Sequence, residues 1–150
     1  MYDEMMTEAI AEARKAEKRG EVPIGAVIEK DGEIIGRGHN LTETLKDPTA
    51  HAEMIAIQSA AKKLGGWRLS GCNLYVTCEP CAMCAGAMVN ARVRRVIFGM
   101  SDPRSGAAGG ALNITGFPGM LHQVEVKSGV LELECKALMQ QFFQNLRTSK

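Results

Sequence analysis

Residues 74–84, which read LYVTCEPCAMC, contain the change of pattern that decides the fold. The first four include tyrosine, valine and threonine, types that favour strands, and they predict a short strand over 74–77. Pro80 follows within three residues, and a proline in the first turn is typical of a helix start. We therefore expect a helix over 81–90, directly after the strand.

Segments on both sides of this unit continue the alternation of strands and helices. Apolar residues three and four positions apart predict helices, and short apolar runs beside turns predict strands. Helices are expected over 2–19, 50–64 and 132–146, and the further strands over 24–29, 33–38, 95–98 and 123–126. The remaining polar or glycine-rich segments predict loops over 40–49 and 105–110.

The order of these elements predicts the fold class. Strands that alternate with helices favour a three-layer α/β/α arrangement, in which crossover connections make some strands parallel. Asp31-Gly32 is a turn signal that predicts an antiparallel hairpin, so we expect a mixed central sheet. Because no repeat or linker interrupts the sequence, we expect one domain over residues 1–150. The last helix is expected to gather its apolar residues on one side: Leu133, Ala137, Leu138, Gln141 and Phe142.

Composition and charge narrow the class of protein. The 150 residues are 45% hydrophobic and 23% charged, which excludes a disordered or fibrous chain. The net charge of +1 excludes a protein held to nucleic acid or membrane by bulk charge, but not one with a local basic patch. No apolar run approaches the roughly 20 residues of a membrane span, and the N-terminus lacks the pattern of a signal peptide. We therefore expect a cytoplasmic protein.

Cysteine and histidine spacing points to a metal site. Of the five cysteines, three lie within residues 78–84, a poor disulfide framework and a better metal or thiol pattern. Cys81 and Cys84 are three apart at a helix start, so they share one face. His51 stands at the start of the helix over 50–64, and two helix starts can face each other. We expect Cys72 and Cys135 to be plain buried thiols.

One imidazole and two thiolates are the three protein ligands of an open zinc site. Such a site keeps a fourth position for water, whose pKa zinc lowers from ~15.7 to about 7. Glu53, two residues after His51, then need not be a ligand and is placed for acid–base work. This set predicts metal-assisted hydrolytic attack on an electrophilic carbon.

Other interpretations of the same residues remain open at this stage. Cys78 extends the pair to C-x-x-C-x-x-C, which could give a fourth zinc ligand or three ligands to an iron–sulfur cluster. A zinc-stabilised RNA-binding module without turnover would also contain these ligands.

The motifs resemble those of the zinc-dependent nucleobase and nucleoside deaminases, whose signature is H-x-E followed by P-C-x-x-C. Three stretches are similar to the bacterial tRNA-specific adenosine deaminase family: EVPIGAV from Glu21, DPTAHAE from Asp47 and EPCAMCAGAM from Glu79. Val96–Gly99, Asp102 and the stretch from Ser105 continue the likeness. Cys78 departs from it, because Thr-Cys-Glu-Pro-Cys is similar to guanine and cytosine deaminases of the same superfamily.

This resemblance implies conversion of adenosine to inosine at the wobble position of a tRNA anticodon. It also implies a homodimer with a mixed five-stranded, cytidine deaminase-like sheet. His51, Cys81 and Cys84 would bind one zinc ion, and Glu53 would activate the water for attack at C6 and move the protons. Asn40 matches the position that hydrogen-bonds the flipped nucleoside, and Asp102 matches a carboxylate that contacts the neighbouring nucleotide.

Basic and aromatic residues near the C-terminus suggest where RNA would lie. The basic surplus falls in the second half of the chain, at Arg92, Arg94, Arg95, Arg104, Lys136, Arg147 and Lys150. Phe143 and Arg147 lie four apart on one side of the last helix, so we expect them to face RNA, where a base could stack. Phe142 is expected in the core.

Overall fold

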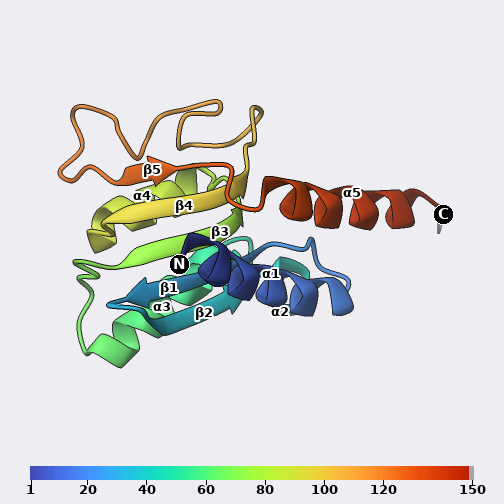
Figure 1. The fold of residues 1–150 in the computed structure, drawn as a ribbon, viewed down its shortest axis with the longest axis horizontal. Helices are drawn as coiled ribbons and strands as arrows, with labels where there is room; N and C mark the ends of the chain where they lie inside the picture. Colours follow the sequence, from blue (N-terminus) through green and yellow to red (C-terminus); the bar gives the residue numbers. More distant parts are fainter. Residues whose placement is uncertain (149–150) are drawn as a thin grey trace.

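In the computed structural model, which describes residues 1–148, five strands form one mixed sheet in the order β2-β1-β3-β4-β5 (Figure 1). The strands are β1 (Gly25–Lys30), β2 (Glu33–His39), β3 (Asn73–Cys78), β4 (Arg95–Met100) and β5 (Glu125–Lys127). β1 is antiparallel to both β2 and β3, whereas β3, β4 and β5 are parallel. The predicted hairpin and the predicted mixed sheet are therefore confirmed.

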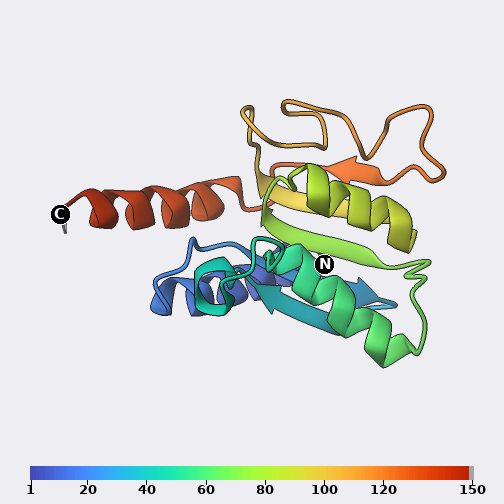
Figure 2. The same ribbon diagram turned by 180° about the vertical axis from the view of Figure 1, so that it is seen from behind.

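Helices cover both faces of the sheet. They are α1 (Tyr2–Lys18), α2 (Thr42–Leu45), α3 (Ala52–Leu64), α4 (Ala82–Ala91) and α5 (Glu132–Thr148). α1 and α5 pack on one face, and α3 and α4 cover the other (Figures 1 and 2). This confirms the three-layer α/β/α prediction. Within residues 1–148, no helix is long and apolar enough to cross a membrane.

Alternating side chains on the strands build a core on each face of the sheet. Ala26 and Ile28 of β1 pack with α3 and α4, whereas Val27 between them packs with α1. Tyr75 of β3 and Ile97 of β4 likewise face α1 and α5, while their neighbours face the other side. The two-residue period of a strand thus divides the apolar residues between two cores.

Two glycines of β2 let α3 approach the sheet very closely. A Cβ atom on Gly36 would meet the backbone oxygen of Ala56, and one on Gly38 would meet that of Ala52. Because α3 also presents small alanines to the sheet, helix and strand pack backbone to backbone. This contact fixes the position of the α3 N-terminus, which carries His51.

Two of the sequence predictions need correction. The predicted loop over 40–49 contains the short helix α2, whose backbone N–H groups at Glu43 and Thr44 donate to the buried carboxylate of Glu21. A partner 22 residues away in sequence holds this turn, so local pattern did not predict it.

The apolar side predicted for the last helix is wrong in part. Leu138 is buried, as predicted, and so is Cys135, whereas Leu133 is 77% exposed and Phe142 is only partly buried. The reason is that α5 packs on β4 near its start and then extends beyond the end of the sheet (Figure 1). Of the basic residues singled out above, Lys150 lies outside the described residues.

Replacing Gly38 by alanine should destabilise the protein by about 1–3 kcal/mol, the usual cost of overpacking, because the new methyl group meets the α3 backbone. Gly66→Ala is the matched control, since nothing lies within 4 Å of its Cβ position. Urea unfolding measured on both variants checks the difference. Equal free energies of unfolding would show that α3 can shift without cost.

Candidate metal-binding and catalytic site

Strand direction brings the candidate residues to one edge of the sheet. β2, β3, β4 and β5 all run the same way, so their carboxyl ends meet at a common edge. Asn40 follows β2, Glu79 follows β3, and Asp102 comes two residues after the end of β4. A cavity of about 290 Å³ opens at this edge and is lined by all three. The carboxyl edge is where open α/β sheets place their ligands.

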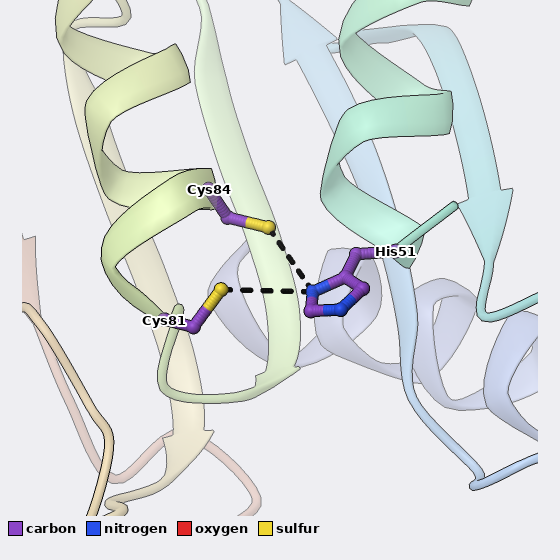
Figure 3. Close-up of side chains that lie close together, drawn as sticks. All are labelled: His51, Cys81 and Cys84. Carbon is purple, nitrogen blue, oxygen red and sulfur yellow. Dashed lines mark hydrogen bonds between the residues drawn. The ribbon is translucent and has the colours of Figure 1, made fainter. Parts of the chain in front are cut away.

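Two helices begin at this edge and point their first residues at each other. His51 is the N-cap of α3 and Cys81 the N-cap of α4, both with extended backbone angles. An N-cap side chain projects past the first turn, so His51 and Cys81 reach the space between the helices. Cys84 reaches the same space from the first turn of α4 (Figure 3). The predicted meeting of two helix starts is confirmed.

The three side chains are spaced as zinc ligands. His51 Nδ1 lies 3.6 Å from the sulfur of Cys81 and 3.5 Å from that of Cys84 (Figure 3). Tetrahedral ligands at the usual Zn–N and Zn–S distances, about 2.1 and 2.3 Å, put nitrogen and sulfur about 3.6 Å apart. The donor set therefore fits one zinc ion in its spacing and in its chemistry. Three donors also leave one tetrahedral position for a further ligand.

The two thiols have opposite pKa shifts. A hydrogen bond from the Cys84 thiol lowers the pKa of Cys81 to about 5 and makes Cys81 the thiolate of the pair. The same hydrogen bond, together with burial, raises the pKa of Cys84. A cation between them would displace the remaining proton, because metal-bound cysteine is a thiolate.

Glu53 is a buried carboxyl group beside these donors. It lies in the first turn of α3, is 4% exposed and lines the same cavity. Burial raises the pKa of its carboxyl group to about 7. The Cys84 thiol hydrogen-bonds to it, so the carboxyl group stands next to the donor set without belonging to it.

Asn40 and Asp102 both line the cavity and are held by different sets of hydrogen bonds. The Asn40 amide donates to Val22 O over 3.4 Å and accepts from Thr42 N over 3.2 Å. The Asp102 carboxylate accepts from Arg104 N and from both the backbone and the hydroxyl of Ser105. Burial alone would raise the pKa of Asp102, but these bonds lower it.

Phe143 and Arg147 do not line the cavity. Both are exposed and lie on the distal half of α5. α5 follows β5, so it starts near the same carboxyl edge and extends beyond it (Figure 1). Phe143 and Arg147 can therefore contact only a ligand that reaches outside the cavity.

Cys78 is the last residue of β3 and belongs to the strand. It lines the cavity, and burial raises the pKa of its thiol to about 12. Among the described residues 1–148, the group that can share a metal ion contains His51, Cys81 and Cys84 but not Cys78. The arrangement therefore favours the open three-donor site over a cluster or a closed site.

The buried carboxylate of Glu79 is a site residue that sequence reasoning missed. It accepts backbone hydrogen bonds from Asp102, Ala108 and Gly110, at 2.8, 3.0 and 2.7 Å. A Cβ atom on Gly110 would collide with the same carboxylate. The glycines of the loop after β4 were the available signal, because a loop that closes on a buried group needs residues without side chains.

The fold and the cavity define the class of protein first. A mixed five-stranded sheet with an open His-Cys-Cys group and a buried glutamate at its carboxyl edge is the arrangement of the cytidine deaminase-like hydrolases. The profile of the MafB19-like deaminase family matches residues 2–147.

Sequence and structural similarity to known proteins identifies the family more closely. The chain is 55% identical over 145 residues to the tRNA-specific adenosine deaminase of Bacillus subtilis (strain 168), covering 97% of this chain and 90% of that protein. It is 47% identical over 151 residues to the enzyme of that name from Haemophilus influenzae, covering 99% and 87%. A solved structure from studies of A-to-I editing by tRNA:A34 deaminases superposes with a TM-score of 0.87 at 45% identity, covering 90% of this chain and 98% of that chain. The chain belongs to the MafB19-like deaminases and to the tRNA-specific adenosine deaminase family.

Zinc content should distinguish the two cavity cysteines. Cys84→Ala removes one of three donors, so we expect the purified variant to hold well under one zinc ion per chain. Cys78→Ala is the control from the same cavity, and it should keep about one zinc per chain by elemental analysis. Zinc loss from both variants, or iron with visible absorbance in the unaltered protein, would contradict the three-donor site.

Glu79→Gln should loosen the loop after β4. The amide turns an NH₂ group toward backbone donors, and an unsatisfied buried group costs about 1–3 kcal/mol. We expect amide hydrogens of residues 102–110 to exchange about tenfold faster or more, by mass spectrometry. Glu33→Gln is the control, since that carboxylate is 73% exposed. Unchanged exchange with normal zinc content would show that Glu79 does not hold the loop.

Proposed function

We propose that this protein converts adenosine to inosine at the wobble position of a tRNA anticodon by zinc-dependent hydrolysis. The observation that carries the proposal is the open His-Cys-Cys group beside buried Glu53, inside a cavity at the carboxyl edge. Membership in the tRNA-specific adenosine deaminase family supports the substrate. The activity belongs to one domain over residues 1–150, which the single continuous sheet supports.

His51, Cys81 and Cys84 would hold the zinc ion, since their donor atoms all lie within 4.8 Å of one another. Zinc bound there would supply a water that is acidic enough to act as a nucleophile at neutral pH. The remaining work falls to the side chains of the chain itself.

Glu53 is the residue placed to move protons. Replacing the 6-amino group of adenosine by oxygen consumes one water and releases ammonia, so both protons of the water must leave its oxygen, one for the ring nitrogen and one for the departing amino group. A carboxyl group next to the donor set can accept each proton in turn and pass it on. Its burial keeps bulk water from competing for these transfers.

The size of the cavity dictates how RNA can enter. A volume of about 290 Å³ admits a nucleobase but not a stem, so the reacting base must be turned out of its stack. Asn40, on the wall, can hydrogen-bond the flipped nucleoside through its amide. Asp102 also lines the cavity, where it can contact the next nucleotide. Phe143 and Arg147, outside the cavity, would bind RNA by stacking and charge.

Homodimerisation and a cytoplasmic location belong to the same proposal. Exposed apolar side chains of the loop after β4 support a covered surface: Leu112 is 53%, Phe117 57% and Leu121 87% exposed. A tRNA substrate supports the location. Light scattering should give a mass of about two chains.

Glu53→Gln should keep zinc and tRNA binding but lose about 100-fold or more of the deamination rate, because the amide cannot exchange protons. The measurement is inosine released by nuclease digestion of tRNA, quantified by mass spectrometry, with zinc content and tRNA affinity as controls. A rate near that of the unaltered protein would refute the proton-transfer role. Equal absence of turnover in both proteins, with tRNA bound, would instead indicate a binding module.

The same digestion tests the substrate. Incubation with tRNA, adenosine, guanine and cytosine should yield inosine at the anticodon wobble position and no product from the free compounds. Formation of xanthine or uracil would be consistent with zinc-dependent deamination but would contradict the RNA substrate. That result would support a guanine or cytosine deaminase, the alternative suggested by Cys78.

A further inference from the structure

A second cavity, of about 470 Å³, lies far from the catalytic one. Its wall includes three arginines and three further polar residues: Arg68, Ser70, Arg92, Arg94, His122 and Gln123. The catalytic site uses none of these residues. Arg92 and Arg94 belong to the basic surplus of the sequence, for which the catalytic cavity gives no role.

The second cavity lies at the amino edge of the sheet. Ser70 precedes β3, Arg94 directly precedes β4, and Gln123 precedes β5. The catalytic cavity is lined by Cys78, at the other end of β3. Five residue steps of a strand span about 17 Å, so the two cavities are separated by at least the length of the sheet.

The arginines of this cavity form no ion pair among the described residues. Within residues 1–148, neither Arg68 nor Arg94 has a carboxylate partner. The one carboxylate on the wall, Glu125, is bound by Arg95 over 2.8 Å. Arg92 donates to two backbone carbonyls at the end of α4 and keeps its charge. Three arginines on one wall, against a single carboxylate that Arg95 already binds, leave a surplus of positive charge, which is the arrangement of an anion site.

An exposed aromatic ring adjoins the arginines. Trp67 is 54% exposed, with the Arg68 guanidinium 4.3 Å and the Arg92 guanidinium 5.8 Å from its ring centre. Tryptophan with arginine on an open surface offers a stacking face and a positive charge together, the combination that binds nucleic-acid backbones and unpaired bases.

We propose that the amino-edge cavity is a second RNA contact, which binds backbone phosphates of the tRNA outside the anticodon loop. The inference rests on the proposed function, because a tRNA is the phosphate-rich ligand that the chain then meets. The net charge of +1 gives no general attraction to RNA, so binding must come from local clusters such as this one. Along the axis of a B-form duplex, each strand advances about 3.4 Å per phosphate, so about five steps cover the ~17 Å from one edge of the sheet to the other.

The test compares Arg94→Ala and the double variant Arg68→Ala/Arg94→Ala with Arg14→Ala. Arg14 is an exposed arginine on α1 that does not line the amino-edge cavity. Its replacement is therefore a matched loss of one positive charge elsewhere on the protein. Two RNAs are used: a whole tRNA, and a hairpin of its anticodon loop with a few base pairs. Affinity is measured over a range of salt concentrations, and inosine formation gives KM and kcat for each RNA.

For whole tRNA, Arg94→Ala should weaken affinity and raise KM about three- to tenfold, with kcat unchanged, and reduce the salt slope by about one. The double variant should lose more affinity for whole tRNA than Arg94→Ala does. Both variants should bind the hairpin and deaminate it as the unaltered protein does. Arg14→Ala should leave affinity, KM and kcat unchanged for both RNAs.

Three results would overturn the second contact. One is an Arg94→Ala variant whose tRNA affinity and salt slope equal those of Arg14→Ala. Another is an equal loss for hairpin and whole tRNA, since the effect would then arise at the catalytic end. The third is millimolar inorganic phosphate that binds the unaltered protein but not Arg94→Ala while tRNA affinity is the same in both, which would assign the cavity to a free anion. Absence of inosine from the unaltered protein would refute the proposed function, and the affinities would still decide the cavity.

Discussion

The common direction of β2, β3, β4 and β5 is the constraint on which the site depends. Each of these strands delivers the chain to the same edge, so the residues that follow them meet although they are up to 62 positions apart, from Asn40 to Asp102. The crossover helices α3 and α4 must then begin at that edge. Their N-cap residues, His51 and Cys81, face each other as a direct result. The donor set is thus a consequence of topology, and only the residue types had to be supplied by the sequence.

Buried carboxylates, rather than regular structure, hold the loops around this edge. Glu21 accepts from the backbone of α2, next to Asn40, and Glu79 accepts three N–H groups of the loop that contains Asp102. A carboxylate offers several acceptor positions in one small group, so it can bind a turn that no neighbouring strand pairs with. Each is 5% exposed or less, and in that setting an unmade bond is costly. Hydrogen bonds to these two carboxylates therefore hold the irregular segments of the cavity wall that contain Asn40 and Asp102.

The parts of the fold that follow local spacing could be predicted from the sequence, and the parts held by distant partners could not. Cys81 and Cys84 are three apart after a proline, which predicts a shared helix face without knowledge of the rest. The three layers followed from the order of strands and helices. By contrast, α2 depends on Glu21, which no periodicity connects to it. The buried side predicted for α5 was right at Leu138 and wrong beyond it, because helical spacing shows that an apolar stripe exists, while the end of the sheet decides how much of the stripe is covered.

Charge is also distributed in a way that the net value conceals. Arg37 forms salt bridges with Glu8 and Glu12 of α1, each at 2.8 Å, and Arg95 forms one with Glu125. Acidic residues thus neutralise arginines where the protein packs against itself, and they leave Arg68 and Arg94 without carboxylate partners among the described residues. A sum of +1 therefore describes a molecule in which some arginines are paired and others, at the amino edge, have no carboxylate partner among the described residues. For a ligand as highly charged as RNA, attraction depends on those unpaired groups, because the fields of the two opposite charges in a pair oppose each other, and salt screens exposed charges that are more than about 8 Å apart.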